Sequence, residues 1–441
     1  MLPSILDRTF KGGVMTSNDG VYRIQVPSTN LAGGGSDMRS RLQTWDWRYR
    51  LPEWVTALEI DFSQNNFIEP WALAQFTAYG LNVKERLRIP VSATLASRNP
   101  ANVYVGQMGL NHVLATGTST PEWDNSSQNT GLHVIRNHQD VIRFVQSAVQ
   151  LGAGPNDDTM DALKYGMAEL GRNVVQHSGS SIGGVAIAQY FPARNALQIS
   201  VCDAGRGVHS SLSRTYPELK TDLEALKLAV LPHVSGAFQQ GVYSGSENAG
   251  LGLFFGKEIC WRAGGSFWLA SQRALLGVTQ KDDAGQNRVY RQIEQFNGTS
   301  VTMDLPASGV EDFGSLLQVC RTLAADARAS SGCAGLDFLD KLPDLDDLAI
   351  VSVETFSEDV EQAAVVRSQQ ILPALQAGEM IVMDFNGVRF ATQSFIHALL
   401  NDAFRVPGSL CRLSFINCSA STEEAVRAVA AYAASYRQCI G

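Results

Sequence analysis

Apolar and polar positions divide the first part of the chain into strand-like and helix-like stretches. Residues 55–62 predict a strand, residues 70–79 carry apolar side chains at helical spacing, and residues 88–95 predict a second strand. Residues 115–130 are polar and rich in turn-forming residues, which indicates a linker or an exposed loop.

A central block, residues 131–306, alternates between the two patterns. A helix is expected from Met160 to His177, with Asp158 or Thr159 as its cap. The polar stretch 277–292 is expected to form a hairpin loop between two strands. The predicted strands of this block are 184–190, 196–203, 265–271 and 299–305.

The C-terminal block alternates strand and helix patterns from start to end, which favours an α/β layered sheet. A Ser-, Gly- and Asp-rich stretch, residues 307–345, precedes it and indicates a boundary. Strands are expected at 348–353, 379–385 and 411–417, and helices at 357–376, 394–404 and 422–435.

Two segments of the chain resemble each other. Residues 58–71 align without gaps on residues 381–394, with Asp61-Phe62 matching Asp384-Phe385. Each segment runs from a strand through Asp-Phe and a tight loop to a helix start. The match predicts a shared domain, and the alternative is a generic strand–loop–helix composition.

The overall composition limits the possible functions. The chain has 441 residues, 45% hydrophobic and 18% charged, enough for two to four domains, and a net charge of −8 that argues against broad nucleic-acid binding. It contains no apolar run long enough to span a membrane and no signal-peptide pattern at its start. The seven scattered cysteines include no C-x-x-C pair, so we expect reduced thiols and a cytoplasmic protein.

One predicted helix carries a carboxylate and an amide that could serve a single site. Glu169, Asn173 and His177 are spaced by four residues and form a stripe beside the buried face. Asn173 can offer an oxygen to Mg²⁺, and Glu169 can accept a proton from a nucleophile that attacks a phosphate. The alternative is an ordinary amphipathic helix with a polar surface.

Two further segments suit a nucleotide. Asp203-x-Gly205-x-Gly207 follows an apolar strand; an Asp there can accept a hydrogen bond from the amine of adenine, and glycines let the backbone approach a flat base. Gly250-Leu251-Gly252 opens an apolar helix, whose N-terminal N–H groups suit a polyphosphate. Each segment alone is compatible with a generic turn.

In this order and spacing, the three segments resemble the nucleotide-binding signature of the GHKL ATPases, which include DNA gyrase and histidine kinases. The resemblance covers residues 160–306, lies nearest the anti-sigma-factor kinases, and implies a two-layer α/β sandwich with a mixed sheet. It makes Glu169 the catalytic base, Asn173 the Mg²⁺ ligand, Asp203 the adenine reader and residues 231–248 the ATP lid. It further assigns nucleotide binding to Gly205, Gly207, Gly250, Leu251, Gly252 and Thr299.

The C-terminal block resembles the STAS domains of anti-sigma-factor antagonists, through residues 382–390 and Thr392-Gln393-Ser394-Phe395. In that family a GHKL-type kinase phosphorylates a serine near this helix start. The usual Asp-Ser-Ser/Gly sequence is absent here, so Thr392 and Ser394 are either acceptors or helix caps. The N-terminal copy has Glu69-Pro70-Trp71 instead, which predicts a docking or dimer surface.

The resemblances together predict a three-domain cytoplasmic regulator of α/β (α+β) class. The expected parts are a STAS-like domain at 1–128, a GHKL ATPase domain at 129–310, a linker at 311–345 and a STAS-like domain at 346–441. We expect ATP and Mg²⁺ as cofactors and a protein partner, with a homodimer as one assembly, and neither membrane nor nucleic acid as partner.

Three functions remain open at this point. The chain is an ATPase or a serine/threonine protein kinase of the anti-sigma type, or it is a non-catalytic ATP-gated interaction switch. A DNA-repair-like or chaperone-like GHKL machine is disfavoured, because no transducer domain with its lysine follows residue 306. A histidine kinase is disfavoured as well, because His133 and His138 lack the usual sequence context.

Overall fold

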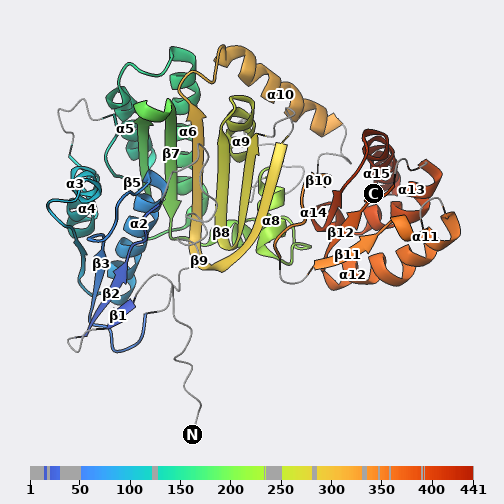
Figure 1. Cartoon of the computed structure of the whole chain (residues 1–441), viewed down its shortest axis with the longest axis horizontal. Helices are drawn as coiled ribbons and strands as arrows, with labels where there is room; N and C mark the ends of the chain where they lie inside the picture. The colour runs from blue at the N-terminus through green and yellow to red at the C-terminus, as the bar shows by residue number, and fades with distance from the viewer. Residues whose placement is uncertain are drawn as a thin grey trace, which may run out of the picture. The chain divides into compact units, whose positions relative to one another are not determined.

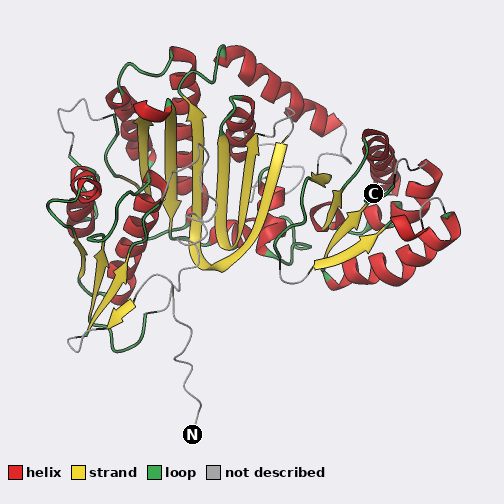
Figure 2. Cartoon of the chain, in the orientation of Figure 1, coloured by secondary structure: helices red, strands yellow, loops and turns green. Residues whose placement is uncertain are grey.

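The computed structural model describes residues 14–16, 20–29, 51–121, 128–232, 234, 251–280, 286–329, 335–345, 348–356, 359–388, 391 and 393–440. The chain divides into two compact units, Met1–Gly207 with Ile293–Glu311, and Val208–Gln292 with Asp312–Gly441. Both units combine helices with parallel and antiparallel strands, which confirms the α/β (α+β) class (Figures 1 and 2).

The first unit begins with a four-stranded sheet of order β1-β2-β3-β4. Strand β1 is antiparallel to β2, whereas β2, β3 and β4 are parallel. The strands are β1 (Val14–Thr16), β2 (Val21–Gln25), β3 (Ala57–Asp61) and β4 (Val91–Thr94), and the helices are α2 (Pro70–Leu87), α3 (Pro100–Gln107) and α4 (Leu110–Thr116).

Helix α2 joins this sheet to the central part of the same unit. Pro70 at its first turn suits a helix start, and Arg88 ends it in the left-handed conformation. Every residue from Pro70 to Val83 is buried, because the helix contacts the central strands β6 and β7 as well as its own sheet. The amide of Trp71 donates to Oε1 of Gln198 on β7 at 3.2 Å.

The central strands of the first unit are antiparallel and follow the order β5-β6-β7-β9. Helices α5 and α6 contact each other and pack on this part of the fold (Figure 1). Strand β9 runs from the second unit into the first. The elements are β5 (His133–Ile135), α5 (His138–Gln146), α6 (Asp157–Asn173), β6 (Gly184–Phe191), β7 (Ala196–Asp203) and β9 (Gln286–Pro306).

The second unit contains β8 (Ser266–Gln280), the first part of β9, and helices α7 (Gly207–Leu212), α8 (Asp222–Ala229) and α9 (Gly252–Arg262). The prediction of a hairpin loop over residues 277–292 is wrong. Strand β8 continues to Gln280 and β9 begins at Gln286, and Leu276, Val278 and Tyr290 are buried within these strands. Arg288 lies two residues from Tyr290 on the same face of β9, and both side chains donate hydrogen bonds to Asp337.

The C-terminal sheet of the second unit is fully parallel, with the order β10-β13-β12-β11. An apolar core lies between one face of this sheet and the helices that follow its strands (Figure 2). The strands are β10 (Asp337–Leu339), β11 (Leu348–Ser352), β12 (Met380–Asp384) and β13 (Leu413–Ile416), and the helices are α11 (Val360–Val366), α12 (Leu372–Ala377), α13 (Gln393–Leu400), α14 (Ser409–Arg412) and α15 (Ala420–Ile440).

Residues 311–345, expected as a linker, carry regular structure. Helix α10 spans Phe313–Ala329, and β10 forms the edge of the C-terminal sheet beside β13. Within this Ser- and Gly-rich stretch, the short strand β10 is stabilised by its pairing with β13 and not by the strand propensity of its own residues.

Candidate functional site

Helix α6 carries the first predicted segment. Its cap is Asn156, whose side chain accepts a hydrogen bond from the amide of Thr159 at 2.8 Å, so the prediction of Asp158 or Thr159 as the cap is wrong. The α-helical part ends at Asn173 and continues as a π-helical turn, Val174–Ser178. Such turns occur frequently at functional sites.

Glu169 is a half-buried carboxylate on α6 that pairs with Arg172 one turn later. Burial raises the pKa of Glu169, and the Arg172 guanidinium offsets part of that rise. A carboxylate with a raised pKa is a better proton acceptor, which is the property that a general base needs.

Asn173 lies one turn after Glu169 on the same side of α6. Its Nδ2 atom is buried and makes no hydrogen bond to any of the described residues. Because the oxygen and nitrogen of a side-chain amide can be exchanged by rotation, this buried position can equally present an acceptor. A side-chain amide with one polar atom that makes no hydrogen bond is suited to coordinate a hydrated Mg²⁺ ion.

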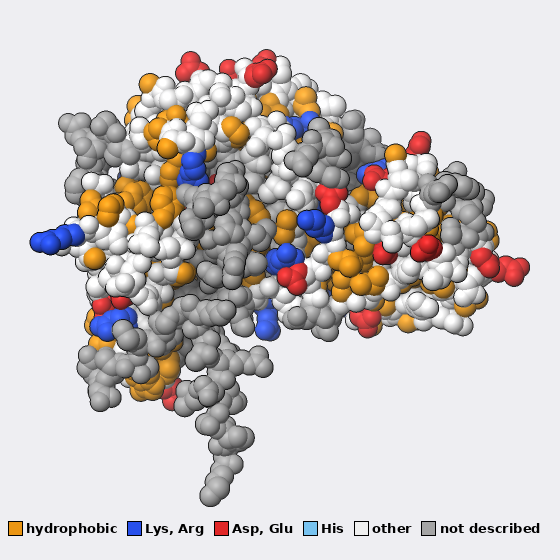
Figure 3. All heavy atoms as spheres, viewed as in Figure 1, with side chains coloured by type: hydrophobic (Ala, Val, Ile, Leu, Met, Phe, Trp, Pro, Cys, Tyr) orange, Lys and Arg blue, Asp and Glu red, His pale blue; other side chains and the backbone are white. Residues whose placement is uncertain are grey.

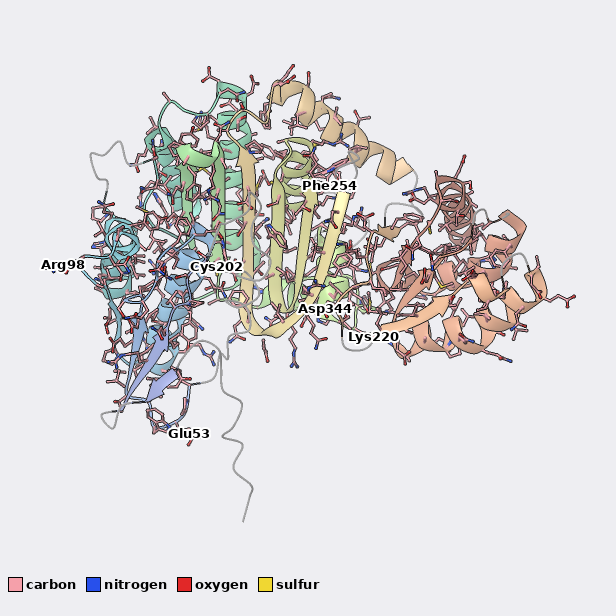
Figure 4. All side chains as sticks on the ribbon, viewed as in Figure 1. Glu53, Arg98, Cys202, Lys220, Phe254 and Asp344 are labelled. Atoms are coloured by element: carbon pink, nitrogen blue, oxygen red, sulfur yellow. The ribbon has the colours of Figure 1, made fainter. Side chains whose placement is uncertain are left out.

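Asp203 ends β7, next to Cys202, which Figure 4 labels. Its side chain is buried, and Oδ1 accepts a hydrogen bond from the amide of Gly205 at 2.8 Å. Burial raises the pKa of Asp203 to about 7, although backbone hydrogen bonds from Gly205 and Thr299 oppose the rise. Thr299 on β9 is the register partner of Asp203. A buried carboxyl at a strand end can accept a hydrogen bond from a ligand donor such as an exocyclic amine.

Two glycines beside Asp203 leave no space for a side chain. A Cβ at Gly205 would lie 2.1 Å from the carbonyl oxygen of Ser178, and one at Gly298 would lie 2.0 Å from the carbonyl oxygen of Asp203. Gly298 also has a φ of +108°, which favours glycine. The two glycines therefore allow the backbone around Asp203 to pack closely on itself.

The structure brings the first two predicted segments together. The amide of Arg206 donates to the carbonyl of Ser178 at 2.9 Å, so the π-helical turn after Asn173 is tied to the loop that follows Asp203. His177 lies in this turn, where burial first and Arg206 second lower its pKa. Glu169, Asn173, Asp203, Gly205, Gly207 and Thr299 all belong to the first unit.

The third predicted segment belongs to the second unit and is described only in part. Gly250 lies outside the described residues, Leu251 is buried, and Gly252 begins α9. Of residues 231–248, expected as the ATP lid, only 231, 232 and 234 are among those described.

The candidate phosphate acceptors of the C-terminal block cannot be placed. Thr392 lies outside the described residues, as does the side chain of Ser394, and α13 begins at Gln393, one residue before the predicted start. The histidines disfavoured as acceptors lie at unsuitable places: His133 is on strand β5, where burial lowers its pKa to about 4, and His138 begins α5.

Sequence reasoning missed a group of buried charges in the second unit. Asp337 of β10 contacts Lys227 at 2.8 Å and Arg288 at 2.7 Å, and Arg412 pairs with Glu224 at 2.9 Å. A cavity of about 30 Å³, roughly the space of one water molecule, adjoins Lys227, Arg288 and Asp337. No local motif marks these residues, since each is a single charge in an otherwise ordinary element.

Comparison with known proteins identifies one part of the chain. A family model described as a STAS-like domain of unknown function (DUF4325) matches residues 362–423. The C-terminal block is therefore STAS-like, as its sequence predicts. No protein with a curated description matches the chain. Among the described residues, no helix combines the length and apolar character that a membrane crossing requires.

Proposed function

We propose that the chain binds Mg·ATP beside Asp203 and acts as an ATP-dependent regulator of the GHKL class, either as an ATPase or as a serine/threonine protein kinase of the anti-sigma type. The observation that carries the proposal is the buried carboxyl of Asp203, held by the amide of Gly205, with no space for side chains at Gly205 and Gly298. This arrangement suits a flat base that presents an amine.

The residues of α6 fit the phosphate end of such a ligand. Asn173 would hold Mg²⁺ through its amide, and Mg²⁺ supplies charge neutralisation between phosphate oxygens. Glu169, with its raised pKa, would accept the proton of the attacking hydroxyl or water.

One observation favours the alternative of a non-catalytic ATP-gated switch. The carboxylate of Glu169 is engaged by Arg172, and a base that stays paired with a guanidinium accepts a proton poorly. Under this alternative ATP is bound and released without chemistry, and the signal is the change in conformation.

Equilibrium binding with Mg²⁺ tests the nucleotide site. We expect saturable binding of ATP, with GTP at least about tenfold weaker, because GTP places a carbonyl where Asp203 needs a donor. Equal affinities for ATP and GTP would contradict the role of Asp203 in recognising adenine. If neither nucleotide binds, the proposed function is wrong.

Phosphate transfer separates the kinase from the switch. The chain is incubated with γ-labelled ATP and Mg²⁺, as the wild type, as Glu169→Gln, and as the matched control Asp161→Asn, which changes an exposed carboxylate of α6. Label or released phosphate that disappears only in Glu169→Gln supports catalysis. Thr392→Ala and Ser394→Ala then identify the acceptor within the chain. ATP binding without transfer or hydrolysis supports the switch.

The C-terminal STAS-like domain suggests how the nucleotide state is used. We propose that it contacts a protein partner, and that a homodimer is a possible assembly. The described cysteines Cys202, Cys260, Cys320, Cys411 and Cys418 are free thiols, which suits the cytoplasmic location proposed from the sequence.

A further inference from the structure

The N-terminal and C-terminal sheets share three strands in the same register. Strands β2 and β3 pair from Val21↔Ala57 to Gln25↔Asp61, and β11 and β12 pair from Leu348↔Met380 to Ser352↔Asp384. The next strands also correspond, since Asp61 pairs with Thr94 and Asp384 with Ile416. The two sheets are therefore comparable strand by strand.

The loop after the central strand is also the same in both sheets. Oδ1 of Asp61 accepts from the amide of Ser63 at 2.8 Å, and Oδ1 of Asp384 accepts from the amide of Asn386 at 2.8 Å. The amides of Phe62 and Phe385 donate to the neighbouring strand at 2.9 Å and 3.0 Å. The helices then begin at the aligned positions Pro70 and Gln393.

The fourth strand lies on opposite sides of the two sheets. In the N-terminal sheet, β1 pairs antiparallel with the outer edge of β2. In the C-terminal sheet the added strand is β10, which pairs with β13, and β11 forms the other edge. Within the described part of the chain, β11 pairs with β12 alone (Figure 1).

The residue at the centre of this edge is apolar. Ile350 pairs with Val382 as Arg23 pairs with Glu59, so Ile350 and Arg23 occupy the same place. Arg23 has Met15 of β1 as its register partner and forms an ion pair with Glu59. Ile350 is 52% exposed. Edge strands usually carry charges that discourage pairing, so an exposed isoleucine marks an edge that accepts a strand.

Charges on either side of β11 indicate what kind of strand it accepts. Among the described residues, Asp344 precedes it, and Glu354 and Asp359 follow it. Figure 3 shows apolar side chains with both acidic and basic side chains near them in the part of the view where β11 lies. Antiparallel pairing with β11 of a second copy would place one acidic flank opposite the other, which is destabilising.

We propose that the outer edge of β11 binds an extended segment of a partner protein as an added antiparallel strand. The segment carries a β-branched residue opposite Ile350 and Lys or Arg at both ends, which complement the acidic flanks. Main-chain hydrogen bonds supply affinity, and the two ends fix the direction. The added strand would lie beside β11 as β1 lies beside β2 in the N-terminal sheet. This interaction does not depend on ATP binding.

A designed peptide tests the proposal on the full chain. The probe is fluorescein-labelled Lys-Lys-Val-Thr-Val-Thr-Val-Lys-Lys, and two controls replace its central Val with Pro or all its Lys with Glu. Ile350→Lys alters the edge, and the matched variant Val365→Lys alters another exposed residue, on α11. We expect saturable binding of the probe that Ile350→Lys weakens at least about tenfold, equivalent to ~1.4 kcal/mol, while Val365→Lys leaves it unchanged.

Hydrogen exchange locates the bound peptide. The β11 amides that do not bond to β12 should exchange rapidly in the free chain and slowly with the probe, and the Pro and Glu controls should leave them rapid. The proposal is overturned if the probe does not bind, if the Pro control binds equally, or if these outward amides are already protected in the free chain. A wild-type dimer that Ile350→Lys dissociates would assign the edge to a second copy and also overturn it.

Discussion

Oδ2 of Asp337 lies 2.8 Å from Nζ of Lys227, and the two side chains are 3% and 6% exposed. Asp337 belongs to β10 of the C-terminal sheet and Lys227 to α8, and Arg288 and Tyr290 of β9 also donate to this carboxylate. Ser414 of β13 donates to it as well at 3.3 Å, so one buried carboxylate joins α8, β9 and the C-terminal sheet within the second unit.

Loss of this carboxylate charge should destabilise the second unit. Asp337→Asn leaves Lys227 and Arg288 buried without a counter-charge, and breaking a buried pair in this way costs about 3–5 kcal/mol. Chemical denaturation followed by fluorescence measures the change. The matched control Glu424→Gln alters an exposed carboxylate of α15 and should change stability by less than about 0.5 kcal/mol. Equal stabilities of the two variants would contradict a structural role for the pair.

The same carboxylate predicts a dependence on acid. Burial alone would raise the pKa of Asp337, but Lys227 and Arg288 outweigh it and lower the pKa from 3.8 to about 2. A depressed pKa in the folded state contributes stability above the unfolded pKa of about 4, and this contribution is lost as pH falls toward 2. The stability difference between wild type and Asp337→Asn should therefore shrink over that range. A difference that stays constant with pH would refute the assignment.

Asp203, whose pKa is raised and not lowered, predicts a pH dependence of ligand affinity. Burial raises the pKa of Asp203 to about 7, so in the free protein this carboxyl changes from neutral to ionised as the pH rises through that value. The ionised form is the stronger acceptor for the amine of adenine, so affinity should rise as pH increases through about 7. Titrations with adenosine as well as ATP check this, because adenosine carries no phosphate. Affinity that is flat or falls with pH would contradict the role of Asp203 as the adenine reader.

The sequence predicts the strand that bears Asp203 to the residue, whereas the strand that bears Thr299 is longer than expected. Strand β7 spans Ala196–Asp203 as expected, because an apolar run stops at a polar residue followed by glycine. The internal repeat is equally visible, since Asp61-Phe62 and Asp384-Phe385 mark the same turn, and the structure gives both segments the same register.

Other features depend on contacts between residues that are distant in sequence. The pairing of Asp337 with Lys227 cannot be read from either element, because a buried ion pair leaves no periodic pattern. The sequence does not predict the long strands β8 and β9 over residues 277–292, since this stretch is mostly polar and resembles a loop. The end of α6 also differs, because the sequence gives no sign that the helix widens to a π turn after Asn173.

The central claim is that Asp203 reads adenine in an ATP site, and the most direct measurement is ATP affinity in Asp203→Asn. The substitution keeps the size of the side chain but replaces an acceptor oxygen with a donor, and Asp161→Asn on α6 is the matched control. By calorimetry with Mg²⁺, we predict that Asp203→Asn weakens ATP binding at least about tenfold, ~1.4 kcal/mol, with Asp161→Asn unchanged. An unchanged ATP affinity in a folded Asp203→Asn protein would contradict the site and the function proposed from it.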